Sequence, residues 1–227
     1  MINRMISLKH RLPKVYSIII RFIHLLADWL MISDSGKDNI FKVNTSYFQK
    51  SSLKINGHNN DITIHNSFLD SFRLRIIGNN NRVLISDNCN LHGLEIWIED
   101  DGNIIEIGES TIINGNTHLA CIEGKTIRVG SKCLFSSNIT FRVGDSHSIL
   151  ENGRRINPSK DIILGNHVWL GNNVTILKGV TIGDDSVIGT NSVVTHKVPT
   201  KTIYAGNPAK EIKNNITWNI KRIPTED

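Results

Sequence analysis

Residues 164–199 repeat every six positions, and this repeat limits the possible folds more than any other feature of the chain. The register reads LGNHVW, LGNNVT, ILKGVT, IGDDSV, IGTNSV and VTHKVP, and each hexad opens with Leu, Ile or Val. The fifth position of each hexad is small or β-branched. Such a period fits neither an α-helix nor the alternation of a strand. It predicts a solenoid in which three hexads, about 18 residues, form one triangular coil.

The repeat also predicts which side chains form the core. The opening aliphatic residues point into the prism with the small fifth residue beside them, while Gly, Asn and Asp occupy the corners. Successive coils stack about 4.8 Å apart, and this stacking supplies the core because one coil cannot bury its own face. The openers are Leu164, Leu170, Ile176, Ile182, Ile188 and Val194.

A looser repeat precedes the hexads. INGHNNDITI, IIGNNNRVLI, WIEDDGNIIEI and CIEGKTIRV resemble one another, and the last residues of these segments lie 21, 22 and 22 positions apart: Ile64, Ile85, Ile107 and Val129. This spacing predicts parallel β-helix coils with a wider, Asn- or Asp-rich corner. The repeat thus covers about 55–199, with one interruption near 147–161 that begins at His147.

Composition restricts the class of protein without naming its activity. The 227 residues suffice for one or two domains. The net charge of +5 is spread along the chain, which fits binding of anionic groups and does not by itself argue for nucleic acid. Cys89, Cys121 and Cys133 follow no metal or disulfide spacing, so we expect small buried side chains in a reducing compartment and a soluble, cytoplasmic protein.

The N-terminal region needs a separate interpretation. Residues 15–32 are apolar but contain Arg21, His24 and Asp28, which argues against a membrane-spanning helix. No small-residue cleavage site follows, so a signal peptide is not expected. Two alternatives stay open: an amphipathic helix on an anionic membrane surface, or a helix packed on the protein body or a partner subunit. We divide the chain into an N-terminal helical or variable segment (1–50), a parallel β-helix (51–200) and a C-terminal tail (201–227) that folds back as a short extended piece plus a helix.

Residues 161–213 resemble the hexapeptide-repeat acyltransferases, especially the branch of galactoside, maltose, Nod-factor and capsular polysaccharide O-acetyltransferases. The resemblance rests on VWLG at 168–171, KGV at 178–180 and AGNPA at 205–209. Two further segments, FRVGDSHSI and INPSKDI, most resemble the bacterial surface-polysaccharide O-acetyltransferases. The resemblance implies an all-β, left-handed parallel β-helix and a homotrimer with acetyl-CoA grooves between neighbouring prisms. It also implies that the interruption is an extruded catalytic loop carrying a histidine.

Three residues are the candidates for catalysis. His147 would act as general base, because a sugar hydroxyl is barely ionised at neutral pH and an imidazole titrates near the working pH. Asp145 would orient that imidazole or bind the acceptor, unless it is only a corner residue. Trp169 occupies an outward hexad position. The resemblance places it in the acetyl-CoA cleft, with the adjacent subunit as one source, and the alternative is burial at the trimer interface.

The resemblance also supplies candidate binding residues. Those for acetyl-CoA are Gly171 in the VWLG run, Asn172, Thr190 and Thr195 along the pantetheine, and His196, Lys210 and Lys213 near the phosphates. Asn116 and Arg142 are candidates for acceptor binding, and no metal is expected.

The expected activity is direct transfer of an acetyl group from acetyl-CoA to a hydroxyl of a bacterial surface glycan. An antibiotic or an amino-sugar nucleotide is the alternative acceptor. A zinc-dependent β-helix enzyme is disfavoured because the nine histidines include no pair five apart within the coils. A scaffold without activity is disfavoured because the outward residues His147 and Trp169 are intact.

Overall fold

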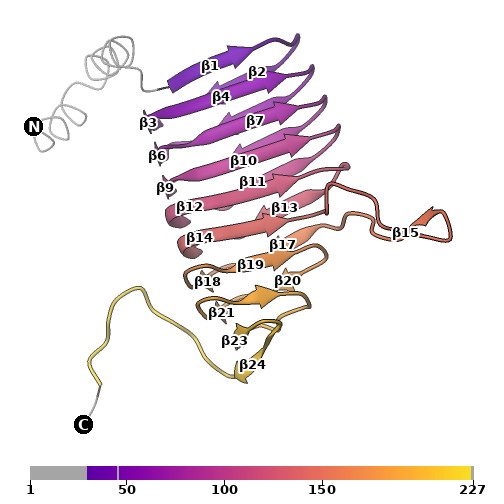
Figure 1. Cartoon of the computed structure of the whole chain (residues 1–227). Helices are drawn as coiled ribbons and strands as arrows, with labels where there is room; N and C mark the ends of the chain where they lie inside the picture. The colour runs from indigo at the N-terminus through magenta and orange to yellow at the C-terminus, as the bar shows by residue number, and fades with distance from the viewer. Residues whose placement is uncertain (1–29, 45, 226–227) are drawn as a thin grey trace, which may run out of the picture.

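The computed structural model describes residues 30–44 and 46–225 (Figure 1). Within these ranges the chain is an all-β, left-handed parallel β-helix without an α-helix. The predicted helical segment at 15–32 lies almost wholly outside them. No helix within the described ranges is both long and apolar enough to span a bilayer.

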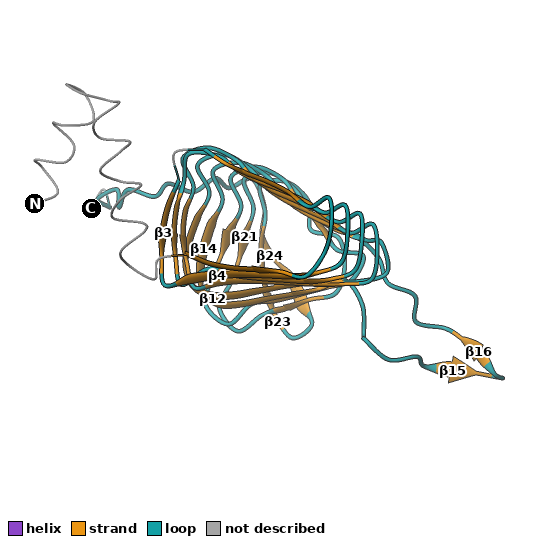
Figure 2. Ribbon diagram, turned by 90° about the horizontal axis from the view of Figure 1, so that it is seen from above, coloured by secondary structure: helices purple, strands orange, loops and turns teal. Residues whose placement is uncertain are grey.

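Three flat faces, built from stacked parallel strands, enclose the core (Figure 2). The first face contains β1 (Leu30–Asp34), β4 (Ser51–Asn56), β7 (Arg73–Ile77), β10 (Leu94–Glu99), the second halves of β12 (Ile112–Cys121) and β14 (Leu134–Arg142), β19 (Thr175–Leu177) and β22 (Val193–Val194). The second face contains β2 (Ile40–Val43), β5 (Asp61–Ile64), β8 (Arg82–Ile85), β11 (Ile104–Ile107), β13 (Thr126–Val129), β17 (Ile162–Leu164) and β20 (Thr181–Ile182). The third face contains β3 (Tyr47–Gln49), β6 (Phe68–Asp70), β9 (Asn90–His92), the first halves of β12 and β14, β18 (Trp169–Leu170), β21 (Val187–Ile188) and β23 (Ile203–Gly206).

The hexad register is confirmed by the packing. All six opening residues are at most 1% exposed, and the small fifth residues beside them are fully buried. The longer upstream spacing is confirmed too, because Ile64, Ile85, Ile107 and Val129 are successive partners on the second face. The next partner of Val129 is Leu164, which lies 35 positions later, whereas Leu164 and Ile182 are 18 apart. The extra 17 residues leave the solenoid as a loop.

The wide corner between the first and second faces contains a buried ladder of amides. The side-chain oxygen of Asn60 accepts hydrogen bonds from both the backbone N–H and the side-chain amide of Asn81, each at 3.0 Å. Asn39 and Asn103 continue the same pattern above and below. The Asn-rich turns of the sequence therefore stack on one another, and each amide satisfies backbone groups that the prism would otherwise bury unpaired.

One segment boundary and the tail differ from the sequence prediction. The β-helix begins by Leu30, because β1 and β2 pair with β4 and β5, so the boundary at residue 50 is one coil too late. The predicted C-terminal helix is wrong: β24 (Ala209–Lys213) pairs antiparallel with β23, and residues 214–225 contain no helix. The hairpin covers the open edge left by the last coil, where unpaired strand N–H and C=O groups need partners.

All three cysteines are buried and unpaired, as predicted. Burial raises the pKa of the Cys121 thiol to about 12 and that of Cys133 to about 11. Thiols of this kind stay protonated at neutral pH, so neither is suited to be a nucleophile.

Candidate active site

The extruded loop (144–161) leaves the solenoid at the corner between the first and second faces (Figure 2). Its tip is a hairpin of β15 (Leu150–Glu151) and β16 (Arg154–Arg155). At its base the backbone N–H of Lys160 donates to the carbonyl of Val143 at 2.9 Å. The loop is thus closed at its base and projects away from the body.

His147 lies in the outgoing arm of this loop, where its side chain is exposed. Its imidazole forms no hydrogen bond to any residue in 30–44 or 46–225 of the single chain. Its backbone, in contrast, is held: the side-chain amide of Asn157 donates to the His147 carbonyl at 2.8 Å. This arrangement fixes the position of the His147 backbone and leaves its imidazole available to bind another molecule.

Asn157 connects the two arms of the loop and is only 7% exposed. Its amide also donates to the carboxylate of Asp145 at 2.8 Å, and its side-chain oxygen accepts from the backbone N–H of Ile149 at 2.7 Å. The guanidinium of Arg155 donates to the same oxygen at 3.3 Å and pairs with Glu123 of the body at 2.6 Å. One buried side chain therefore organises the stretch that carries His147.

Asp145 is bound to the body rather than to the imidazole. Its carboxylate pairs with the ammonium of Lys178, which belongs to the KGV corner one coil below, and accepts the amide hydrogen bond of Asn157. These two hydrogen bonds hold the pKa of Asp145 below its ordinary value. Asp145 is thus an ionised anchor of the loop in this structure.

Trp169 stands on β18 of the third face, away from the loop. Figure 1 shows β18 on the opposite side of the solenoid from β15. The side chain is 38% exposed, and its ring lies 5.9 Å from that of Trp218, which belongs to the C-terminal tail. A single chain therefore does not bring Trp169 to His147.

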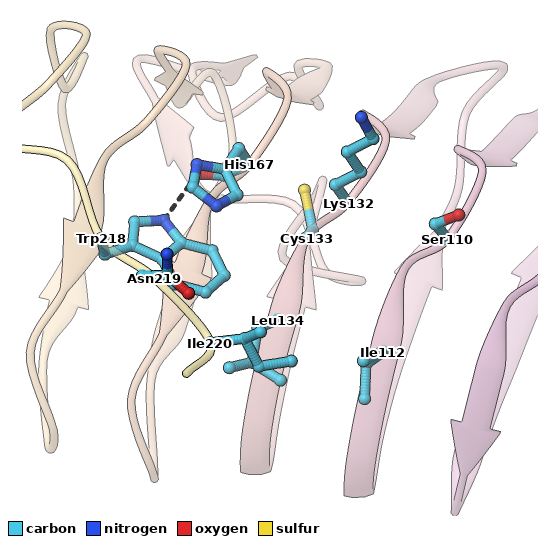
Figure 3. A pocket seen from close by; sticks show the side chains of 9 residues that line it. All are labelled: Ser110, Ile112, Lys132, Cys133, Leu134, His167, Trp218, Asn219 and Ile220. Carbon is cyan, nitrogen blue, oxygen red and sulfur yellow. Dashed lines mark hydrogen bonds between the residues drawn. The ribbon is translucent and has the colours of Figure 1, made fainter. Parts of the chain in front are cut away.

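The tail is fixed to this side of the solenoid by Trp218. Its indole stacks on the ring of His167 at 4.0 Å, and its N–H donates to the His167 carbonyl at 2.7 Å (Figure 3). His167 in turn contacts the carboxylate of Asp185 at 2.8 Å. A hollow of about 300 Å³ lies beside this stack, between the tail and the third face, and its lining includes Ile112, Leu134 and Ile220.

Five of the candidate acetyl-CoA residues flank β19 and β22, the last two strands of the first face. Gly171, Asn172 and Thr190 lie at the corner between the third and first faces, and Thr195 and His196 lie at the opposite corner. The side-chain oxygen of Asn172 accepts from the backbone N–H of Ser137 at 3.0 Å, so it also supports the corner. The hydroxyl of Thr195 lies 2.7 Å from Nδ1 of His196.

The remaining candidates occupy two further places. Lys210 and Lys213 are exposed on β24, beyond the last coil. Asn116 belongs to an exposed ladder in which its amide donates to Asn138 at 3.2 Å. Arg142 ends β14 and donates to the hydroxyl of Ser146 at 3.2 Å, next to His147. Within residues 30–44 and 46–225, no three His, Cys, Asp or Glu side chains form a metal-binding group.

Three residues of the loop and the tail were not predicted from the sequence: Asn157, Lys178 and Trp218. Asn157 and Lys178 stand in the INPSKDI and KGV segments, which carry the family resemblance, so their position was a usable signal. Trp218 lies in a polar tail with no periodic pattern, and no local signal pointed to its contact with His167.

Comparisons with known proteins agree with this architecture. The family model described as Bacterial transferase hexapeptide (six repeats) matches residues 161–196. The Polysialic acid O-acetyltransferase of Escherichia coli O1:K1 / APEC is 40% identical over 119 residues, which are 52% of this chain and 38% of that protein. The Polysialic acid O-acetyltransferase of Neisseria meningitidis is 39% identical over 143 residues, which are 61% of this chain and 66% of that protein. The matches thus span less than two thirds of either relative's length.

A solved structure matches over nearly its full length. The crystal structure of the polySia specific acetyltransferase NeuO superposes with a TM-score of 0.80 at 33% identity, over 86% of this chain and 91% of that one. Together with the six-repeat match and the extruded loop, this similarity shows that the chain belongs to the hexapeptide-repeat family of bacterial acyltransferases.

Proposed function

We propose that this protein transfers an acetyl group from acetyl-CoA to a hydroxyl of an acidic bacterial surface polysaccharide of the polysialic acid type. The observation that carries the proposal is the extruded loop, which holds the backbone of His147 through Asn157 and leaves its imidazole free. The similarity to two polysialic acid O-acetyltransferases supports the class of acceptor.

The chemistry is a direct transfer with His147 as general base. The imidazole accepts the proton of the sugar hydroxyl while the hydroxyl oxygen forms a bond to the acetyl carbon of the thioester. The carbon–sulfur bond of the thioester then breaks, and the imidazolium returns the proton to the leaving thiolate. No covalent acetyl-enzyme is required, which agrees with the burial of all three thiols.

The proposed active unit is a homotrimer that works in the cytoplasm. Within one chain Trp169 lies on the opposite side of the solenoid from His147, whereas a ring of three chains allows the loop of one subunit to approach β18 of the next. The flat faces of the solenoid suit such packing. Free, buried cysteines suit a reducing compartment.

The test is acetyl-CoA turnover, followed by thiol release, with a panel of acidic and neutral polysaccharides, an antibiotic and an amino-sugar nucleotide as acceptors. His147→Ala should lose a factor of about 10²–10⁴ while its affinity for acetyl-CoA stays unchanged. Ser148→Ala, which alters the adjacent exposed residue, is the matched control and should keep wild-type turnover. Full activity of His147→Ala would disprove the role of the histidine, and turnover confined to a small acceptor would disprove the polysaccharide.

A further inference from the structure

A row of outward side chains runs along the first face towards the extruded loop. The strand register aligns, from coil to coil, the five residues Lys54, Arg75, Trp97, Ala120 and Arg142. Four steps of about 4.8 Å make the row roughly 19 Å long. We call it the acceptor row.

The cations of this row carry unneutralised charge. Lys54 and Arg75 are exposed, and Arg142 is partly exposed. Within the described part of the chain none of them lies within 4.0 Å of a carboxylate oxygen. On the second face, in contrast, Arg82 and Arg128 both pair with Glu106. The three cations of the row therefore keep their full charge, whereas Arg82 and Arg128 share one carboxylate.

One cation of the row is held in a fixed orientation. The guanidinium carbon of Arg75 lies 4.5 Å from the ring centroid of Trp97, one coil below. A cation over an aromatic face is attracted to it, and a planar guanidinium fixed in this way can bind a carboxylate with two parallel hydrogen bonds. The nearby acids already have partners: Glu99 accepts the indole N–H of Trp97, and Glu95 contacts His118.

The row ends at the catalytic loop. Arg142 is its last cation, and the same side chain donates to Ser146, next to His147. The candidate acetyl-CoA residues lie on the coils below this point, from Gly171 onwards. The two substrates would therefore approach His147 along the solenoid from opposite ends, with the acceptor lying on the N-terminal coils.

We propose that the acceptor row binds an acidic polysaccharide as an extended chain, with carboxylates of separate sugars on Lys54, Arg75 and Arg142. This inference rests on the proposed function and specifies its substrate: a polymer held at several sugars at once, rather than a single sugar. If the polymer is held by several carboxylate–cation contacts, its binding should weaken as the salt concentration rises.

The experiment compares two double variants with the same loss of charge. Lys54→Ser/Arg75→Ser removes two cations of the row, and Lys42→Ser/Arg82→Ser removes two exposed cations of the second face. Acetyl transfer is measured at several salt concentrations with a long acidic polysaccharide and with a mono- or disaccharide of the same sugar. Thermal unfolding confirms that both variants are folded.

The row variant should raise the KM for the long polysaccharide about three- to tenfold, leave kcat and the short acceptor unchanged, and flatten the salt dependence. The control variant should match the wild type. An equal rise of KM in both variants, or no rise in the row variant, would overturn the proposal while leaving the acetyltransferase intact. Absence of transfer by the wild type to any acidic glycan would instead reject the proposed function.

Discussion

The side-chain amide of Asn157 donates hydrogen bonds to the main-chain carbonyl of His147 and to the carboxylate of Asp145, both at 2.8 Å. Asn157 lies ten residues after His147 and twelve after Asp145, so this one buried side chain joins the two arms of the loop. We expect Asn157→Ala to lower kcat about 10²-fold, because a small displacement of a catalytic group has a cost of this order. Steady-state kinetics with a polysaccharide acceptor measures it.

The control separates positioning from folding. Asn157→Asp keeps the oxygen that accepts from Ile149 and Arg155 but cannot donate to Asp145 or to the His147 carbonyl. It also places a second negative charge beside Asp145. The kcat of this variant should therefore be at least as low as that of Asn157→Ala. The KM for acetyl-CoA and the melting temperature should change little in either. A wild-type kcat for Asn157→Ala would contradict the positioning role.

The ion pair between Asp145 and Lys178 predicts a pH dependence of the loop. The folded-state pKa of Asp145 is lowered, chiefly by its hydrogen bond to Lys178. The anchoring contribution is therefore fully present above the ordinary aspartate pKa of about 4 and is lost as the pH falls through the lower folded value. Hydrogen exchange of the Ile149 N–H, corrected for the intrinsic rate, should show protection that declines below about pH 4.

The matched variant is Asp145→Asn, which removes the titrating carboxylate. It should lower protection of the Ile149 N–H at neutral pH and abolish the acid-dependent decline. Protection in the wild type that stays constant down to the lowest pH would argue against Asp145 as the anchor.

The stack of Trp218 on His167 predicts a local effect on the tail. Trp218→Ala removes the aromatic contact and the hydrogen bond to the His167 carbonyl, which together are worth about 1–2 kcal/mol. Because residues 214–225 contribute no strand to the solenoid, the loss should appear as faster proteolysis of the tail, with little change in the melting temperature. Trp218→Phe keeps the stacking and should be cleaved at an intermediate rate. Equal cleavage of all three proteins would refute the contact.

The amide ladder predicts a large loss of stability from one polar residue. Asn81 is 1% exposed, donates to Asn60 and accepts from Asn103. Asn81→Ala leaves the buried backbone N–H of Asn103 without its acceptor and removes one of the two donors to the Asn60 oxygen, which should cost about 1–3 kcal/mol of unfolding free energy in denaturant titrations. The neighbouring Asn80 is exposed with a φ of 55°, so Asn80→Gly should change it by less than about 0.5 kcal/mol. Equal effects at the two positions would contradict the ladder.

The inward-facing residues of the solenoid could be predicted from the repeat. A hexad opener such as Ile182 must be buried wherever the coil stacks, so periodicity alone located the core, the 21- to 22-residue upstream spacing and the segment that leaves the solenoid. The repeat is local in sequence and has one solution in space, because stacking is the only way to bury its apolar positions. The resemblance of 161–213 then supplied the family, and that of FRVGDSHSI supplied His147 as the candidate base.

The contacts of the outward and non-repeating residues could not be predicted in this way and became visible in the folded chain. The contact of Asn157 with His147, the stack of Trp218 on His167, 51 residues away, and the alignment of Arg75 with Trp97 all join positions that no periodic rule relates by side-chain type. The helix predicted for the C-terminal tail was wrong for the same reason, since the open edge of the last coil, and not local propensity, determines the hairpin found there. Inward positions are constrained by a repeated geometry, whereas outward positions are constrained only by the particular neighbours that folding brings to them.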